Sequence, residues 1–134
     1  MSKPDALRQA AFAAMENAYA PYSRFRVGAA VRTATGEIVA GCNVENAAYG
    51  EALCAERAAI AAAVARGLRD FEEIVIASES DDPTPPCGSC RQTMSEFAPD
   101  LKVTSYAKNG KQATWRLTDL LPAAFTLNHL RGRQ

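Results

Sequence analysis

The spacing of apolar residues predicts three helices that are well separated along the chain. Apolar positions recur at helical spacing through residues 4–19, and Pro21 ends that pattern. Residues 54–66 are rich in alanine, which favours a helix, and Gly67 is expected to terminate it. Helical spacing returns in residues 88–97. Strand patterns separate these segments, so helices and strands are expected to alternate.

Five segments between and after these helices have the composition of β-strands. The run Ile74-Val75-Ile76 is apolar at consecutive positions, which is typical of a strand buried on both faces. Turn residues at Thr35-Gly36 and at Lys108-Asn109-Gly110 join two further pairs of strands. The chain therefore predicts an α/β sheet with helices on its faces. The expected strands are residues 25–32, 37–42, 71–78, 101–107 and 113–117.

Smaller features mark where these elements bend or end. Gly41 indicates a β-bulge in the second strand, and the segment 43–46 follows where that strand should end. Residues 81–86 consist mainly of proline and aspartate, so they are expected to form a loop. Either Thr118 or Asp119 is expected to cap a short final helical turn.

Length and composition indicate an intracellular globular protein. The 134 residues are expected to form one domain, residues 1–134, that buries a core without disulfides. Four cysteines are too few for a disulfide scaffold and suit a reducing compartment. The first residues lack the pattern of a signal peptide, and no apolar run approaches the roughly 18 residues of a membrane span. We therefore expect a cytoplasmic protein with no membrane partner.

The charge balance argues against a nucleic-acid partner. Basic residues number 15 and acidic residues 15, so the formal net charge is zero. Proteins that bind a phosphate backbone usually have a clustered basic face. Here the basic residues are scattered, and only residues 131–133 are locally basic, at an end expected to be solvated. The composition therefore favours a small-molecule substrate.

Two cysteine motifs contain the candidate chemistry. Cys54 is followed by Glu56 two positions later, and a Pro-Cys-x-x-Cys segment supplies Cys87 and Cys90. This combination is the signature of zinc-dependent deaminases. A catalytic zinc takes three protein ligands and leaves its fourth position to water. We therefore expect Cys54, Cys87 and Cys90 to bind one zinc ion, and Glu56 to be the catalytic residue that transfers protons.

Two other interpretations of the cysteines remain open. A Cys-x-x-Cys pair can be a redox motif. It can also be half of a structural zinc site, for which Cys42 or His129 would have to supply the fourth ligand. A redox motif alone does not explain why a separate Cys-x-Glu motif opens a helix upstream. The catalytic site is favoured because two separated motifs agree on one mechanism. Cys42, in a predicted strand, is expected to be free.

The negative charge of three thiolates has to be offset at such a site. A zinc ion with three thiolate ligands has a net negative charge. Such a site lowers the pKa of a bound water less than a site with neutral ligands does. Both cysteine motifs open predicted helices, whose N-termini favour thiolates. Arg57 is the candidate for the remaining charge compensation. The alternative is that Arg57 is a solvated charge on the helix surface.

Six segments together identify a family. They are residues 21–25, 27–30, 43–47, 54–57, 86–92 and 120–122, which read PYSRF, VGAA, NVENA, CAER, PCGSCRQ and LLP. On these segments the chain resembles the small, homotetrameric cytidine deaminases over nearly its whole length. The resemblance implies a five-stranded mixed β-sheet sandwiched by helices, with one zinc ion per subunit. It also implies hydrolysis of cytidine and 2′-deoxycytidine to the uridines, with release of ammonia.

The resemblance also implies roles for residues of a nucleoside pocket. Asn43 and Glu45 resemble the residues that bind the ribose hydroxyls. Phe25 resembles the aromatic ring that packs against the base, where stacking contributes about 1–3 kcal/mol. Ala55 resembles the residue whose backbone contacts the base edge. Members of the family complete each pocket from neighbouring subunits. The other expected substrate-binding residues are Val44, Ala47, Tyr49 and Phe125.

Two of these aromatic residues have alternative roles, and the chain departs from the family pattern at a few positions. Phe25 can instead be a core aromatic, and Phe125 can be a packing residue at a subunit interface. The chain departs from the usual family pattern at Glu51, at Thr126 and at the acidic pair Asp81-Asp82.

Two rival functions also follow from the same motifs. A deaminase of a related aminopyrimidine nucleoside, such as blasticidin or a 5-substituted cytidine, would share the cysteine motifs. The segment 43–46 argues against it, because this segment resembles the ribose-binding segment of the cytidine enzymes. The second rival is a structural zinc-binding module. Loss of activity in a Glu56→Gln variant that keeps its zinc would exclude such a module.

Overall fold

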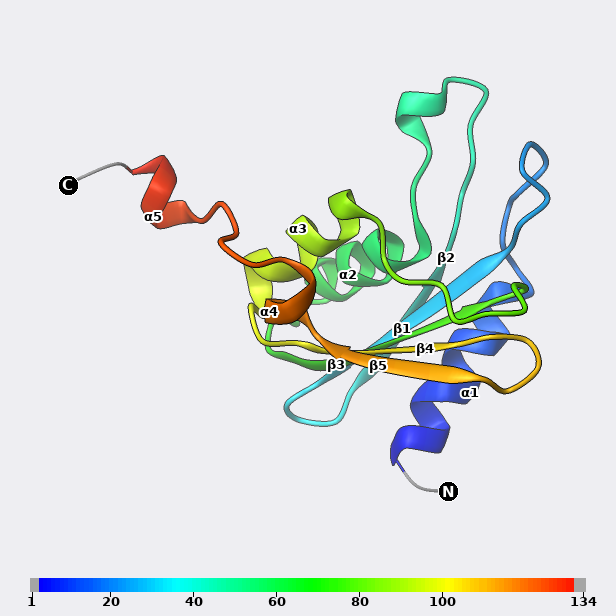
Figure 1. Cartoon of the computed structure of the whole chain (residues 1–134), viewed down its shortest axis with the longest axis horizontal. Helices are drawn as coiled ribbons and strands as arrows, with labels where there is room; N and C mark the ends of the chain where they lie inside the picture. The colour runs from blue at the N-terminus through cyan, green and yellow to red at the C-terminus, as the bar shows by residue number, and fades with distance from the viewer. Residues whose placement is uncertain (1–2, 132–134) are drawn as a thin grey trace.

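The β-sheet is mixed and has the strand order β2-β1-β3-β4-β5. The computed structural model describes residues 3–131 and places this sheet between helices on its two faces (Figure 1). Strands β3 and β4 are parallel, and the other neighbouring strands are antiparallel. The predicted α/β fold with a five-stranded mixed sheet is confirmed. The strands are β1 (Val27–Thr33), β2 (Ile38–Cys42), β3 (Phe71–Ser78), β4 (Lys102–Tyr106) and β5 (Gln112–Arg116).

The three long helices divide between the two faces of the sheet. Helix α1 (Lys3–Met15) packs on one face, and α2 (Ala55–Ala65) and α3 (Gly88–Phe97) pack on the other. Helix α3 makes the crossover that the parallel pair β3 and β4 requires. Within the described residues, no helix combines the length and apolar character needed to cross a lipid bilayer. The short helices are η1 (Tyr49–Glu51), α4 (Leu117–Leu120) and α5 (Leu127–Leu130).

Strand β3 lies at the centre of the sheet and contributes to two hydrophobic cores. Ile74 and Ile76 are buried in the core that includes α2 and α3, whereas Val75 and Ala77 are buried on the α1 face. Successive side chains of a strand point to opposite faces, so a strand covered on both sides needs consecutive apolar residues. The prediction of a strand buried on both faces is confirmed.

Helix α1 ends at Met15, before the predicted end at residue 19. The residues that follow form a tight turn, in which the Ala18 N–H donates to the Met15 carbonyl oxygen at 3.1 Å. The Tyr19 N–H donates to the Asn43 carbonyl oxygen at 3.0 Å, and the Glu45 N–H donates to the Tyr19 carbonyl oxygen at 2.9 Å. These bonds withdraw Tyr19 from the helix and attach it to the segment after β2.

Gly41 is not a β-bulge, so that sequence prediction was wrong. Gly41 pairs with Ala29 in a regular antiparallel register, and the shift in β1 lies between Arg32 and Thr33 instead. A Cβ atom at Gly41 would lie 2.5 Å from the backbone nitrogen of Ala59 in α2. Glycine is therefore required because α2 packs directly on the backbone of β2.

Gly28 allows a similar close approach on the α1 face. A Cβ atom there would lie 2.0 Å from the Ala11 carbonyl oxygen and 2.6 Å from the Met15 nitrogen. Both atoms belong to the α1 backbone and cannot move aside easily. We therefore expect Gly28→Ala to lower the free energy of unfolding by about 1–3 kcal/mol or more. Urea denaturation measures this loss. Gly50→Ala is the control, because nothing lies within 4 Å of a Cβ atom at Gly50. Equal urea midpoints of unfolding for the two variants would contradict the close contact between Gly28 and the α1 backbone.

The cap of helix α4 lies two or three residues earlier in the chain than predicted. Its N-cap residue is Arg116, not Thr118 or Asp119, so that prediction was wrong. Leu117 is buried in the core that contains α3, which fixes the start of the helix at that residue. The Thr118 hydroxyl donates to the Asp100 carboxylate instead of capping.

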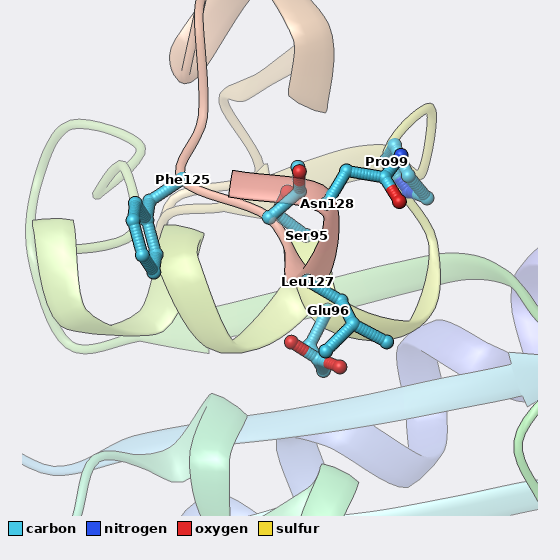
Figure 2. Close-up of a pocket in the computed structure, with 7 residues that line it drawn as sticks. Ser95, Glu96, Pro99, Phe125, Leu127 and Asn128 are labelled. Atoms are coloured by element: carbon cyan, nitrogen blue, oxygen red, sulfur yellow. The ribbon is translucent and has the colours of Figure 1, made fainter. Parts of the chain in front are cut away.

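Helix α5 was not predicted and lies on a tail that extends away from the sheet (Figure 1). The Gln92 side-chain amide donates to the Phe125 carbonyl oxygen at 2.8 Å and attaches the tail to α3. Figure 2 shows the resulting cavity of about 250 Å³ between the tail and the end of α3. Thr126 and His129 form a capping box that starts α5.

Candidate active site

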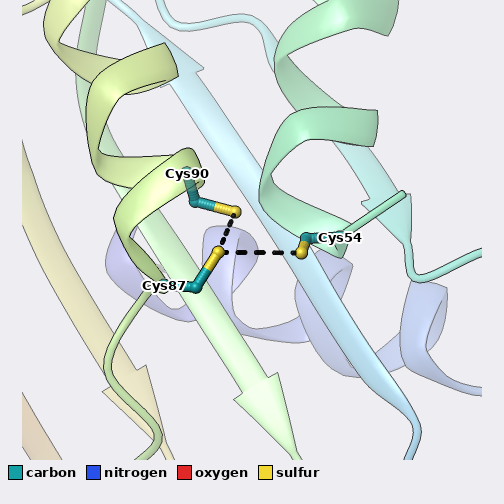
Figure 3. Close-up of side chains that lie close together, drawn as sticks. All are labelled: Cys54, Cys87 and Cys90. Atoms are coloured by element: carbon teal, nitrogen blue, oxygen red, sulfur yellow. Dashed lines mark hydrogen bonds between the residues drawn. The ribbon is translucent and has the colours of Figure 1, made fainter. Parts of the chain in front are cut away.

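The N-termini of α2 and α3 bring three cysteines together (Figure 3). Cys54 is the N-cap residue of α2, Cys87 is the N-cap residue of α3, and Cys90 lies in the first turn of α3. The sulfur atoms of Cys54 and Cys87 are 3.9 Å apart, and those of Cys87 and Cys90 are 3.5 Å apart. All three sulfur atoms lie within 4.8 Å of one another. The fold thus assembles the ligand set expected from the sequence.

The spacing of these sulfur atoms fits a zinc ion. With zinc–sulfur bonds of about 2.3 Å, tetrahedral ligands place their sulfur atoms about 3.8 Å apart. Among the residues that the structure describes, this is the only group of three or more potential metal ligands. Neither Cys42 at the end of β2 nor His129 in α5 belongs to it. The group therefore has three protein ligands, the number typical of a catalytic zinc.

Arg57 contacts this cysteine group from the first turn of α2. Its Nη2 atom lies 3.8 Å from the Cys54 sulfur and donates to the Ala52 carbonyl oxygen at 3.2 Å. The pKa of the Cys54 thiol is lowered to about 5, because Cys90 donates to its sulfur and because Arg57 and Cys87 add favourable contacts. The geometry therefore places a guanidinium charge where a thiolate is stabilised.

Glu56 is a buried carboxyl group beside the cysteines. Only 6% of its surface is exposed, although it stands in the first turn of a helix. Burial raises the pKa of Glu56 to about 7, and the negative charge of Cys54 adds to this effect. A carboxyl group with a pKa near neutrality can accept and release a proton under the same conditions.

A cavity of about 230 Å³ adjoins the cysteine group. It joins two of the expected zinc ligands to the residues expected to bind substrate. The sequence-predicted residues that line it are Phe25, Asn43, Glu45, Cys54, Ala55, Glu56 and Cys87.

Several lining residues were not predicted as site residues. Ser23 and Val27 lie in segments that carry the family resemblance, but no role was derived for them. Thr84 and Pro85 belong to a segment that sequence patterns identify only as a loop, and Ile76 is part of the central strand. Their sequence signal concerns packing and turns, so only the fold shows that they face the cavity.

Asn43 uses its side chain to hold the start of β1. Its Oδ1 atom accepts a hydrogen bond from the Val27 N–H, and its Nδ2 atom donates to the Phe25 carbonyl oxygen, both at 2.9 Å. A primary amide has two N–H donors, so one remains for a substrate hydroxyl. Asn43 therefore links the position of Phe25 to the predicted sugar-binding segment.

The Glu45 carboxylate is held by the loop that precedes β1. Its Oε1 atom accepts hydrogen bonds from the N–H groups of Tyr22 and Ser23, each at 3.0 Å. Its Oε2 atom accepts a hydrogen bond from the Ser23 hydroxyl. The Ser23 hydroxyl, with help from these N–H groups, lowers the pKa of Glu45. Glu45 is therefore an ionised hydrogen-bond acceptor in the wall of the cavity.

Four other predicted substrate-binding residues do not line this cavity. Tyr49 is 80% exposed and lines a neighbouring cavity of about 350 Å³ together with Glu45. Phe125 is 61% exposed on the tail (Figure 2). Val44 and Ala47 are also exposed. Within one chain, the structure therefore brings Phe25, Asn43, Glu45 and Ala55 to the cysteines, but not these four residues.

The departures from the family pattern take part in local contacts. Asp81 and Asp82 lie 3.5 Å and 3.7 Å from the ammonium groups of Lys108 and Lys111, and these pairs join the loop before α3 to the β4–β5 turn. The pairs are exposed, so each contributes little to stability. Thr126 is the N-cap residue of α5.

The site is that of a zinc-dependent deaminase, because it combines three thiol ligands at two helix N-termini with a buried glutamic acid and an adjoining cavity. Comparison with known proteins agrees. Residues 1–106 match the family described as "Cytidine and deoxycytidylate deaminase zinc-binding region". The chain belongs to this family of zinc-dependent deaminases.

Individual relatives show how far the similarity extends. A cytidine deaminase of Halalkalibacterium halodurans is 45% identical over 117 residues, which cover 87% of this chain and 89% of that protein. The crystal structure of a cytidine deaminase from Burkholderia pseudomallei has a TM-score of 0.89 and 48% identity, and covers 93% of this chain and 100% of that chain. A blasticidin-S deaminase of Bacillus cereus is 37% identical over 114 residues, which cover 79% of this chain and 81% of that protein.

Cys42 provides a test of the ligand assignment. Because it does not belong to the group of three sulfur atoms, we expect Cys42→Ala to retain one zinc ion per chain. Metal analysis of the purified variant measures this directly. A loss of zinc in this variant would contradict the assignment of Cys54, Cys87 and Cys90 as the ligands.

Proposed function

We propose that this protein hydrolyses cytidine and 2′-deoxycytidine to uridine and 2′-deoxyuridine and releases ammonia. The observation that carries this proposal is the buried Glu56 carboxyl group, which shares one cavity with the thiols of Cys54 and Cys87. The similar cytidine deaminases support the choice of substrate. We assign the protein to pyrimidine salvage in the cytoplasm, where its four cysteines can remain reduced.

Glu56 is the proton carrier of the proposed reaction. Zinc held by Cys54, Cys87 and Cys90 would supply Lewis-acid activation of the attacking water. Glu56 accepts a proton from that water and delivers it to the ring nitrogen beside the attacked carbon. It then takes the second proton of that water, from the hydroxyl group now on the attacked carbon, and transfers it to the amino group, which leaves as ammonia when its bond to that carbon breaks. The raised pKa of Glu56, caused by burial, suits both transfers.

The remaining cavity residues orient the nucleoside. Phe25 packs against the base, and the backbone of Ala55 contacts the base edge. Asn43 and Glu45 bind the sugar hydroxyls, for which the free N–H of Asn43 and the ionised carboxylate of Glu45 are suited. Arg57 offsets the negative charge of the thiolates.

We further propose a homotetramer in which each pocket is completed by neighbouring subunits, with one zinc ion per subunit. The residues assigned to a neighbouring pocket are Val44, Ala47, Tyr49 and Phe125. All four are exposed in the single chain, and three of them are large apolar or aromatic residues. Exposed apolar side chains of this kind are typical of surfaces that other chains cover.

Discrimination between substrates tests the proposed pocket. Among the residues that the structure describes, no lysine or arginine lines the cavity, and Glu45 would repel a 5′-phosphate. Free cytosine would leave the sugar-binding groups without partners. We expect CMP, dCMP and cytosine to be poorer than cytidine by about a hundredfold in kcat/KM, or about 3 kcal/mol. Ammonia release at equal substrate concentrations measures the ratios, and similar rates for CMP and cytidine would indicate a nucleotide deaminase.

Deamination of blasticidin S or of a 5-substituted cytidine is the second candidate function. The similarity to a blasticidin-S deaminase favours its inclusion, although the cytidine deaminases include more similar relatives. The same ammonia assay with blasticidin S as substrate separates the two functions.

A further inference from the structure

The hydroxyl group of Ser23 connects two substrate-facing parts of the cavity. It donates a hydrogen bond to Oε2 of Glu45 and accepts one from the Phe25 N–H at 3.1 Å. Ser23 itself lines the cavity with both residues. One small side chain therefore contacts the carboxylate proposed to bind the sugar and the backbone of the residue proposed to pack on the base.

The backbone between these contacts adopts a conformation that needs support. Arg24 has a φ angle of 58°, in the left-handed region that is unfavourable for residues other than glycine. Its N–H donates to the Ala20 carbonyl oxygen at 3.0 Å. Ser23 directly precedes Arg24, and its hydroxyl group bonds both to the Glu45 carboxylate and to the N–H of Phe25, which directly follows Arg24. These hydrogen bonds therefore hold the backbone on both sides of Arg24. Such conformations persist where surrounding contacts hold them.

The contacts of Glu45 show what the Ser23 hydroxyl adds. An ionised carboxylate has about four acceptor positions. The Tyr22 and Ser23 N–H groups occupy Oε1, and the Ser23 hydroxyl donates to Oε2. One acceptor position on Oε2 therefore remains for a substrate hydroxyl. Removal of the Ser23 hydroxyl would leave the two N–H contacts to Oε1 in place. It would release only Oε2, the oxygen available to a substrate hydroxyl.

We infer that Ser23 is a positioning residue for nucleoside binding, because its hydroxyl holds the Glu45 carboxylate and the Phe25 backbone in one fixed geometry. This inference rests on the sugar-binding role proposed for Glu45. The interaction serves substrate binding and not proton transfer, so its loss should appear in KM. We expect Ser23→Ala to raise KM for cytidine about tenfold and to change kcat by less than about twofold.

A double-mutant cycle on the zinc-loaded protein tests this inference. The variants are Ser23→Ala, Glu45→Gln and the double variant, with cytidine as the substrate. If Ser23 acts through Glu45, then Ser23→Ala should raise KM by less than about twofold in the Glu45→Gln background. Ser23→Thr keeps the hydroxyl group and should restore most of the binding. Circular dichroism and metal analysis confirm that each variant is folded and loaded.

A matched control is available at the other end of β1. Thr35 also donates a side-chain hydrogen bond to a carboxylate, that of Glu37, in the β1–β2 turn. Thr35→Ala should leave both KM and kcat unchanged.

Two results would overturn the inference. Unchanged KM in Ser23→Ala, or a full tenfold effect that persists in the Glu45→Gln background, would show that Ser23 does not act through Glu45. Unchanged KM in Glu45→Gln would overturn the inference together with the sugar-binding role of Glu45. Turnover of cytidine by the unmodified protein tests the proposed reaction separately from all of these outcomes.

Discussion

Glu56→Gln is expected to lower kcat by about 10⁴-fold or more while the protein keeps its zinc and its fold. Glutamine preserves the shape of the side chain but cannot carry the proton. General acid–base groups typically contribute about 10²–10⁴-fold, and Glu56 is proposed to act in both proton transfers, so the effect should reach the top of that range. Steady-state ammonia release, together with metal analysis of the same sample, measures it.

Glu73→Gln is the matched control for this variant. Glu73 is also 6% exposed, and it lies 3.5 Å from the Arg32 guanidinium and 3.8 Å from the Lys102 ammonium group. We expect this control to lower the thermal midpoint, because it removes a buried charge from its partners, and to change kcat by less than about twofold. If Glu56→Gln with bound zinc lost less than about tenfold in kcat, another group would have to transfer the protons.

Cys87→Ala is expected to remove both the zinc and the activity. Cys87 is exposed, so its loss creates no cavity in the core, whereas Cys90 is fully buried. Two remaining thiols are fewer than the three protein ligands of a catalytic zinc. We expect the variant to retain its fold, to lose zinc on dialysis against a weak chelator and to show no detectable ammonia release.

The comparison with Cys42→Ala makes this experiment specific. Both substitutions remove one thiol from a chain with four cysteines. Only Cys87 belongs to the group of sulfur atoms within 4.8 Å of one another. Full zinc occupancy in Cys87→Ala would exclude it as a ligand.

The cysteine group could be predicted because each motif, and the helix start beside it, is recognisable from neighbouring residues in the sequence. Cys54 and Cys87 each stand immediately before a helix, and the sequence patterns located both helix starts to within one residue. The motif spacing then identified which residues meet, although the two helices are far apart in the sequence. The central strand was predicted for the same reason, since burial on both faces leaves a continuous apolar run such as Ile74-Val75-Ile76.

The errors occurred where a distant segment decides the local structure. Tyr19 leaves the helical pattern because Asn43 and Glu45 bind its backbone. Gly41 was interpreted as a bulge, but the reason for glycine is the approach of Ala59 in α2. No local pattern contains either contact.

The loop residues of the site were missed for a related reason. The role inferred for Ser23 depends on Glu45, which is 22 positions away in the sequence. Thr84 and Pro85 carry ordinary loop signals and face the cavity only because the fold returns them to it. Tyr49 and Phe125 lie outside the cavity of their own chain, so the roles proposed for them depend on neighbouring subunits.

The central claim is that this chain binds one zinc ion and uses it with Glu56 to deaminate cytidine. The most direct measurement combines metal analysis with quantification of uridine and ammonia after incubation of the purified protein with cytidine. We predict one zinc ion per chain and equal amounts of uridine and ammonia, one of each for every cytidine consumed. Protein that carries its full zinc and converts neither cytidine nor 2′-deoxycytidine would contradict the claim.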